Sequence, residues 1–272
     1  MKSDSKILFT DLDGTLLDDK KDITAENREA IFNALHKGHS IVITTGRPLA
    51  AALPMIRDLQ LDQDGCYAIT YNGGLLYNCY KKIPVYKETI PLSYVRYIFK
   101  QAEAFHLHCQ TYSDTHVLSN IYNQELEYYV KEIHIPYCIK PGFLDTLTEE
   151  PVKVMTIDLT STDNLCRYRT FMADWAKDKI SIFFSGKGYL EHVMKDVSKG
   201  RAMKILCRHL NIPLENAIAV GDAENDISML QTAAIGIAMV NADSKVKKHA
   251  DFVTKSDNNH SGVAEIIKKF LE

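Results

Sequence analysis

Short apolar runs alternate with longer amphipathic segments through the first third of the chain. Residues 7–10 and 41–43 form continuously apolar runs, which is the pattern of buried strands. Between them, residues 24–38 place apolar side chains at helical spacing and end on a glycine. Pro48 suits the first turn of a second helix, and Asn72-Gly73-Gly74 predicts a turn between two further strands. This part of the chain is therefore expected to alternate strand and helix.

The last third returns to the same alternation. We predict helices over residues 199–210, 225–233 and 261–271, and strands over 217–220 and 234–239. Ser198 is the expected N-cap of the first of these helices. Continuously apolar strands separated by helices are typical of parallel sheets with both faces covered. The predicted fold class is α/β, with a Rossmann-like doubly wound parallel sheet as its core.

The segment of residues 86–190 differs from the rest of the chain in composition and periodicity. Aromatic residues become more frequent, helical periodicity weakens, and residues 152–157 alternate in the manner of a strand with one exposed face. We therefore predict an inserted α+β domain over residues 86–190. The core domain would then be assembled from residues 1–85 and 191–272.

Composition and charge narrow the range of partners. With 46% hydrophobic and 25% charged residues, the chain has the balance of a globular protein. A net charge of −3 offers no general attraction for nucleic acid or an anionic membrane, so neither is an expected partner. The six cysteines include no Cys-x-x-Cys pair, and no apolar stretch approaches the ~20 residues that span a bilayer. These features favour a cytoplasmic protein with reduced thiols and leave its oligomeric state open.

Three of the predicted strands end in residues that can carry chemistry. Asp11 and Asp13 follow the first strand, Thr45-Gly46-Arg47 follows the second, and Gly221-Asp222 follows the strand at 217–220. In an open parallel sheet, ligands bind beyond the carboxyl ends of the strands, so these loops should converge on one site. An extended backbone also points residues two positions apart, such as Asp11 and Asp13, to the same side.

Three carboxylates in one crevice need a cation between them. Mg²⁺ suits Asp11, Asp13 and Asp222, because it prefers carboxylate, carbonyl, water and phosphate oxygens. Lys199 begins a predicted helix, so its ammonium and the helix N-terminus can both face an anion. Asn225 and the hydroxyl of Thr45 add neutral donors for phosphate oxygens. The set predicts a magnesium-assisted phosphoryl site that binds a small phosphorylated metabolite.

Covalent catalysis is the mechanism that these residues suggest. Asp11 would attack phosphorus and become an aspartyl phosphate. Asp13 would protonate the leaving oxygen and then deprotonate the water that hydrolyses the intermediate. For the first of these steps Asp13 must begin protonated, so we expect the charge of Asp11 to raise its pKa.

Four segments, in order along the chain, resemble the motifs of the haloacid dehalogenase superfamily. They are Asp11-Leu12-Asp13-Gly14-Thr15, Thr45-Gly46-Arg47, Lys199-Gly200 and Gly221-Asp222-Ala223-Glu224-Asn225-Asp226. More narrowly, the chain resembles the Cof-type sugar-phosphate phosphatases of that superfamily. This resemblance implies a phosphoric monoester hydrolase whose inserted domain is a mobile cap that sets substrate specificity.

The resemblance also implies a role for each residue of the site. Asp11 would be the nucleophile and a metal ligand, and Asp13 would be the acid/base and give its backbone carbonyl to Mg²⁺. Asp222 would be the remaining protein ligand to the metal, supported by Asp226. The phosphoryl or substrate contacts would come from the backbone of Leu12 and from Thr45, Gly46, Arg47, Lys199 and Asn225.

Simpler interpretations compete for single members of this set. Lys199 can be an ordinary helix-start lysine, although a cation is unfavourable at a helix N-terminus unless an anion is present. Arg47 can contact substrate or only pair with a nearby acid, and Asn72 can reach substrate or only form a turn. An EF-hand loop beginning at Asp11 is excluded, because its sixth position is Leu16 where glycine is required.

Two other functions compete with a phosphatase. One is a phosphosugar mutase of similar fold, and the other is a regulator that binds phosphometabolites without turning them over. The intact pair Asp11 and Asp13 argues against the regulator. The pattern does not identify the substrate: hexose phosphates, other sugar phosphates, flavin mononucleotide and pyridoxal phosphate all suit such a site.

Overall fold

The structure, a computed structural model, describes residues 5–271, which divide into two compact units. A core unit comprises residues 5–46, 54–86 and 198–271, and an inserted unit comprises residues 47–53 and 87–197. The inserted unit continues past the predicted boundary at residue 190. The reason is strand β11 (Tyr189–Met194), which pairs with β9 (Val154–Ile157) and β10 (Ile180–Gly186) of the same unit.

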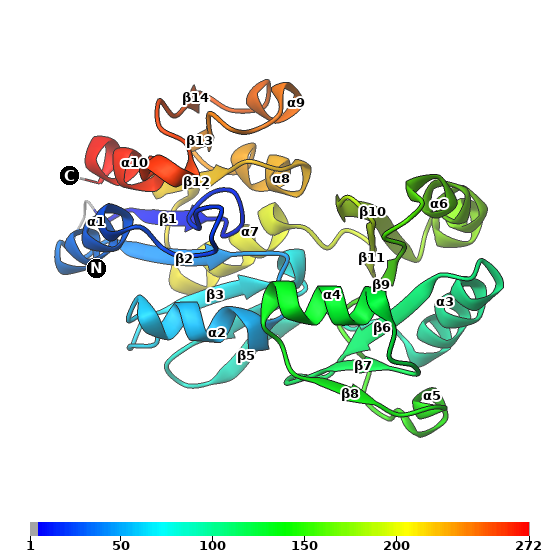
Figure 1. The fold of residues 1–272 in the computed structure, drawn as a ribbon. Helices are drawn as coiled ribbons and strands as arrows, with labels where there is room; N and C mark the ends of the chain where they lie inside the picture. Colours follow the sequence, from blue (N-terminus) through cyan, green and yellow to red (C-terminus); the bar gives the residue numbers. More distant parts are fainter. Residues whose placement is uncertain (1–4, 272) are drawn as a thin grey trace. The chain divides into compact units, whose positions relative to one another are not determined.

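An eight-stranded sheet forms the centre of the core unit (Figure 1). Its strands, in spatial order, are β14 (Phe252–Val253), β13 (Ile235–Ala238), β12 (Ala217–Gly221), β1 (Ile7–Thr10), β2 (Ser40–Thr44), β3 (Tyr67–Thr70), β4 (Leu75–Asn78) and β5 (Ile83–Lys87). The pairs from β14 to β3 are parallel, and β4 turns back antiparallel to β3. The predicted α/β class with a parallel core sheet is confirmed, with an antiparallel addition at one edge.

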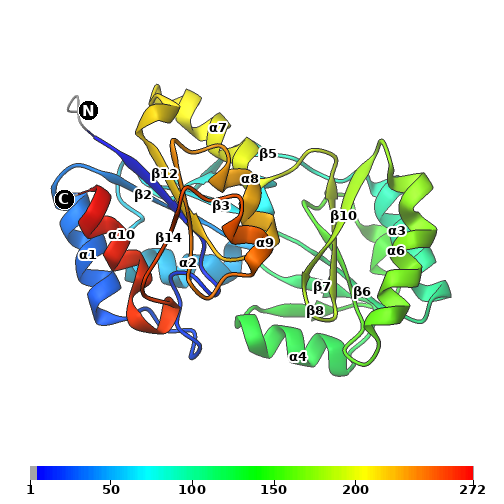
Figure 2. The same ribbon diagram turned by 90° about the horizontal axis from the view of Figure 1, so that it is seen from above.

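Helices cover both faces of this sheet. They are α1 (Ala25–His36), α2 (Leu49–Asp58), α7 (Lys199–Leu210), α8 (Ile227–Leu230), α9 (Ser244–Lys247) and α10 (Gly262–Phe270). Side chains of α7 and α8 pack against one face, where Ile7 and Phe9 of β1 are fully buried. On the opposite face α1 and α10 lie side by side (Figure 2). The apolar strands are thus buried on both sides, which is why they carry no alternating pattern.

Side-chain caps begin two of the predicted helices. Thr24 accepts a hydrogen bond from the backbone N–H of Asn27, and Ser198 accepts one from that of Arg201. The segment predicted as a helix over 225–233 is shorter in the structure. It starts with one 3₁₀ turn (Glu224–Asp226) and ends with α8 at Leu230.

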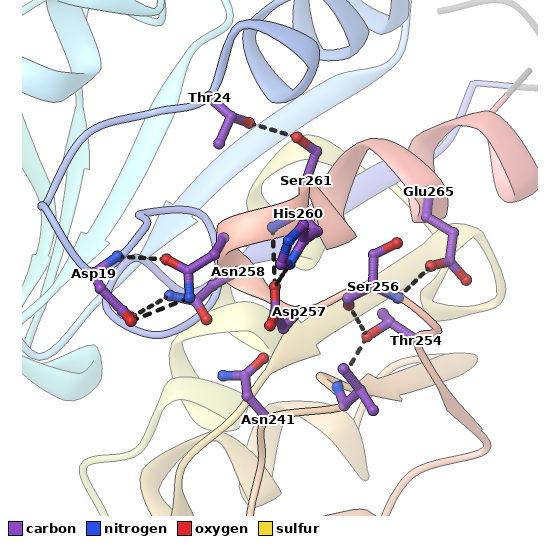
Figure 3. Close-up of polar contacts among 12 residues, drawn as sticks. Asp19, Thr24, Asn241, Thr254, Ser256, Asp257, Asn258, His260, Ser261 and Glu265 are labelled. Carbon is purple, nitrogen blue, oxygen red and sulfur yellow. Dashed lines mark hydrogen bonds and ion pairs between the residues drawn. The ribbon is translucent and has the colours of Figure 1, made fainter.

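The loop that follows Asp13 is tied to the C-terminal part of the core unit. Asn258 and Asn259 both donate to the carboxylate of Asp19, and Thr24 shares a hydrogen bond with Ser261 (Figure 3). The side chain of Asn258 also donates to the carbonyl of Leu17 at 3.1 Å. Residues far apart in sequence therefore fix the loop that leaves the first strand.

The inserted unit is an α+β domain around its own six-stranded sheet. Its strands, in spatial order, are β10 (Ile180–Gly186), β11, β9 (Val154–Ile157), β6 (His108–Tyr112), β7 (Val117–Ser119) and β8 (Tyr137–Ile139). Its helices are α3 (Leu92–Ala104), α4 (Gln124–Ile133), α5 (Phe143–Thr146) and α6 (Thr162–Ala176). Side chains of α3 and α6 pack with β9 and β11 in a separate apolar core. Within residues 5–271, no helix is long and apolar enough to cross a membrane.

Candidate active site

The carboxylates of Asp11 and Asp222 come from adjacent strands at the centre of the core sheet. Asp11 follows β1 and Asp222 follows β12, and the two strands run parallel in direct register. The backbone N–H of Asp11 extends this ladder by donating to the carbonyl of Val220 at 3.1 Å. Because both strands end at the same edge, two residues separated by most of the chain meet there.

Gly14 makes room for the carboxylate of Asp222. Its φ is +74°, and a Cβ atom on this residue would overlap the Asp222 carboxylate. The neighbouring Thr15 donates its hydroxyl to Asp222 Oδ1 at 2.9 Å. The Gly-Thr pair of the first motif therefore fits and orients the acid of the fourth.

Lys199 lies between two of the acids. Its Nζ is 2.6 Å from Asp11 Oδ1 and 2.6 Å from Asp226 Oδ1, and its side chain is completely buried. Lys199 is the first residue of α7, directly after the capping residue Ser198. This position explains how a lysine is retained at a helix N-terminus, where a cation alone would be unfavourable.

Asp226 uses both of its oxygens within the core unit. Oδ1 accepts from Lys199, while Oδ2 accepts from the backbone N–H groups of Asp222 and Ala223 at 3.0 and 2.9 Å. Its side chain also packs on the Cα of Gly221, where any Cβ would overlap it. Asp226 thereby holds the loop that carries Asp222.

The acids outnumber the single ammonium in this cluster. Burial alone would lower the pKa of Lys199, but the charges of Asp11 and Asp226 outweigh burial and raise it. Burial, followed by the charge of Asp226, raises the pKa of Asp222 to about 6. Burial also raises the pKa of Asp11, an effect that Lys199 opposes. Three carboxylates around one ammonium leave a surplus of negative charge that a further cation would neutralise.

Oxygen atoms of Asp11, Asp222 and Asp226 all lie within 4.8 Å of one another. Carboxylates at this spacing suit a hard divalent ion. Asp226 already has hydrogen-bond partners at both oxygens, so Asp11 and Asp222 are the side chains better placed as direct ligands. The residues present therefore fit a metal ion, with Asp226 in a supporting position.

Asp13 is oriented differently from Asp11. Its Oδ1 pairs with Lys21 Nζ at 2.7 Å, and its side chain is 39% exposed. Gly14, with its positive φ, follows Asp13 directly and turns the chain after it. The first proton transfer expected of Asp13 therefore requires its side chain to leave Lys21. Between the two acids, Leu12 is buried and its carbonyl accepts from three backbone N–H groups, those of Thr15, Leu16 and Leu17.

The second motif lies beside the fourth. Thr45 is buried after β2, and its N–H donates to the carbonyl of Ile69. The side chain of Asn225 donates to Asn72 Oδ1 at 2.8 Å, and the Asn72 carboxamide packs against Gly46. Arg47 is also buried. It is the first residue of the segment 47–53, whose contacts place it in the inserted unit.

The pattern predicted the contacts of three residues at this site poorly. It left open whether Asn72 reaches substrate or only forms a turn, and it did not indicate the contact of Lys21 with Asp13 or of Thr15 with Asp222. A surplus acid in the first motif and a lysine in the following loop are the only signals that could have linked Lys21 to Asp13.

Comparison with known proteins identifies the family. The model of the haloacid dehalogenase-like hydrolases matches residues 8–267. The chain belongs to this family. The resemblance noted in the sequence is thereby confirmed, and with it the prediction of a hydrolase.

Individual relatives in this haloacid dehalogenase-like family agree with the assignment. A Streptococcus pyogenes protein named "Putative phosphatase" is 32% identical over 270 residues, covering 98% of each chain. A haloacid dehalogenase-like hydrolase from Bacteroides thetaiotaomicron shares 28% identity with a TM-score of 0.91, over 97% of this chain and 99% of that one. A subclass IIB sugar phosphatase of the superfamily shares 27% identity with a TM-score of 0.81, over 98% of this chain and 99% of that one.

Proposed function

We propose that this protein is a Mg²⁺-dependent phosphatase of small phosphorylated metabolites that works through an aspartyl-phosphate intermediate. One observation carries the proposal: Lys199 bridges Asp11 and Asp226 in a buried cluster whose acids exceed its single ammonium. Such a site attracts a divalent cation and, with it, a phosphate group. The sugar phosphatase among the relatives supports sugar phosphates as the substrate class.

Asp11 is the nucleophile in this proposal. Lys199 engages Oδ1 of its carboxylate, which leaves Oδ2 for in-line attack on phosphorus. A bond forms between Oδ2 and phosphorus as the bond from phosphorus to the substrate oxygen breaks. Before this step Asp13 leaves Lys21 and takes up a proton from solvent. It gives that proton to the departing oxygen, so the alcohol leaves neutral.

Hydrolysis of the intermediate reverses the role of Asp13. Now a carboxylate, it takes a proton from water as the water oxygen bonds to phosphorus. The bond between phosphorus and Asp11 breaks, which restores the carboxylate and releases inorganic phosphate. The contact with Lys21 places an ammonium beside the carboxylate that acts as the base in this second step.

The remaining residues hold the phosphoryl group and the metal. Asp11, Asp222 and the backbone carbonyl of Asp13 would bind Mg²⁺, which when bound neutralises charge on the phosphate oxygens. Asp226 keeps the loop of Asp222 in place. The phosphate oxygens would be contacted by the backbone of Leu12 and by Thr45, Gly46, Arg47, Lys199 and Asn225.

The inserted unit is the proposed source of substrate specificity. It is a separate α+β domain with its own apolar core, which suits a cap that varies independently of the catalytic sheet. The core unit would then supply the chemistry and the cap would select the alcohol part of the substrate.

Phosphate release across a panel of phosphometabolites, with Mg²⁺ and with EDTA, tests the proposal. Asp11→Asn keeps the size of the side chain but removes the nucleophile, so we expect turnover to fall by roughly 10³-fold or more. Asp18→Asn, in the loop nearby, is the matched control and should keep its activity. An isomeric sugar phosphate formed without phosphate release would identify a mutase instead. Binding without either product would identify a regulator.

A further inference from the structure

The turn at residues 71–73 contacts three of the four motifs although it belongs to none of them. The backbone N–H of Asn72 donates to the carbonyl of Thr45 at 3.1 Å. Gly73 lies so close to the carbonyl of Ser198 that a Cβ atom would overlap it, which places this turn against the start of α7. The side chain of Asn72 then reaches Asn225. The turn therefore joins the second, third and fourth motifs.

The carboxamide of Asn72 sits between two proposed phosphate contacts. Its Oδ1 accepts from Asn225 Nδ2 at 2.8 Å, and a Cβ on Gly46 would come within 2.9 Å of the same oxygen. Asn72 itself is buried, whereas Asn225 is partly exposed. A fixed, buried group thus holds a side chain that would otherwise rotate.

The backbone of this turn is held in an unusual conformation. Tyr71, Asn72 and Gly73 all have positive φ, at 52°, 57° and 102°. Asparagine tolerates the left-handed region better than most residues, but a bulky tyrosine is an outlier there. Conformations of this kind persist only where the surrounding structure enforces them, and they concentrate at functional sites.

We infer that Asn72 is a positioning residue that sets the orientation of the Asn225 amide, an inference that rests on the proposed phosphatase function. Because Asn72 Oδ1 can only accept, Asn225 must turn its NH₂ group toward it. One N–H of that group bonds to Asn72, and the second is then directed to a phosphate oxygen. Fixing the amide in advance removes the cost of ordering it when substrate binds.

Asn72→Gly isolates the side chain from the backbone. Glycine adopts positive φ without strain, so the turn is retained while the carboxamide is lost. We expect kcat/KM to fall by about tenfold, mainly through KM, and the inhibition constant of inorganic phosphate to rise by a similar factor. Asn211→Gly is the matched control, because Asn211 is also left-handed, with φ of 54°, but caps the far end of α7. It should leave both constants unchanged.

A double-mutant cycle with Asn225→Ala tests whether Asn72 affects phosphate binding through Asn225. If Asn72 acts through Asn225, the double variant Asn72→Gly, Asn225→Ala will have the same kcat/KM as Asn225→Ala alone. Asn72→Asp keeps the acceptor and adds a negative charge, so it should keep Asn225 oriented but weaken phosphate binding more than Asn72→Gly does. Losses that multiply in the double variant, or wild-type constants in Asn72→Gly, would overturn the inference.

Two further measurements distinguish a positioning role of Asn72 from a structural role and from a failure of the proposed function. A merely structural role would lower the melting temperature of Asn72→Gly below that of Asn211→Gly, and a drop confined to Asn72→Gly would count against positioning. Calorimetric binding of inorganic phosphate in the presence of Mg²⁺ needs no turnover. If the wild-type protein released no phosphate, the proposed function would fail, yet weakened phosphate binding in Asn72→Gly would still support the role of Asn72.

Discussion

Each of the two units buries a lysine beside carboxylates, but the surroundings of the two lysines differ. In the core unit, Lys199 contacts both Asp11 and Asp226, with Asp222 nearby, so acids outnumber the ammonium. In the inserted unit, Lys153 pairs with Glu191 at 3.2 Å. Burial lowers the pKa of Lys153 despite its partner, whereas the pKa of Lys199 is raised.

This difference separates a cluster with surplus carboxylates, which an external cation would neutralise, from a buried lysine–glutamate ion pair. Burying an ion pair brings little net stability, because desolvation offsets the attraction between the partners. Burying surplus carboxylates is unfavourable in isolation and becomes favourable when a metal and a phosphate arrive. The surplus of acids therefore supports the proposal of an active site in the core unit, even though both lysines are equally hidden from solvent.

Removing Lys199 should have the largest effect. Lys199→Met leaves Asp11 and Asp226 buried without their cation, so we expect the free energy of unfolding to fall by about 3–5 kcal/mol and phosphate release to be lost. Urea denaturation and a phosphate assay measure the two effects. Lys204→Met, on an exposed position of the same helix, is the control. A stable and active Lys199→Met variant would contradict the account of the core cluster.

The stability of the metal-free protein should depend on pH through Asp222. Its pKa is about 6 in the folded protein and 3.8 as a reference, so the folded state binds the proton more tightly. This contribution is fully present below pH 3.8 and is lost as the pH rises through about 6. In EDTA, wild type should therefore lose up to about 3 kcal/mol relative to Asp222→Asn across this range. Asp11, whose pKa is also raised, acts in the same direction in both proteins.

Mg²⁺ should reverse that trend. It binds the ionised carboxylates, so it should stabilise the wild-type protein above about pH 6 and have a smaller effect on Asp222→Asn. The free energy of unfolding is measured by urea denaturation across the pH range, for wild type and Asp222→Asn, each with EDTA and with Mg²⁺. Parallel curves for the two proteins in EDTA would show that Asp222 is not the group responsible.

The pair in the inserted unit should show the smallest net effect. Lys153→Met alone leaves Glu191 buried and should be destabilising, but the double variant Lys153→Met, Glu191→Leu should recover most of that loss. Thermal unfolding of the single and double variants measures the coupling between the two residues. A double variant as unstable as the single one would mean that the contrast between the two sheets is not one of charge balance.

Much of the core unit could be predicted because local signals agreed with the final packing. Continuously apolar strands identified the central sheet, and Ser198 marked the start of α7 at the residue where it begins. The boundary of the inserted unit was less accessible to sequence reasoning. β11 crosses residue 190, and its place depends on pairing with β9 some thirty residues earlier, which no local pattern encodes.

The candidate site also contains some residues that the sequence pattern identifies and others whose contacts it does not. Asp11, Lys199 and Asp222 were recognisable because each stands just after a strand or at a helix start, whereas Asp226 was assigned only through the resemblance to the fourth motif. The contacts of Asn72 and Lys21 were not predictable, because they depend on left-handed backbone, with φ of 57° and 67°, that short-range patterns do not specify. Which oxygen of a carboxylate accepts from which donor likewise emerges only from the assembled loops.

The pairing of β1 with β12 determines when this protein can become active during its synthesis. Asp11 and Lys199 are separated by 188 positions, which a ribosome covers in roughly 10–40 s at ~5–20 residues per second. Throughout that interval β1 can pair with β2 but leaves its other edge open, a state prone to wrong association. Nearly all of the inserted unit lies within residues 87–197, so it can fold while β1 still lacks its second neighbour.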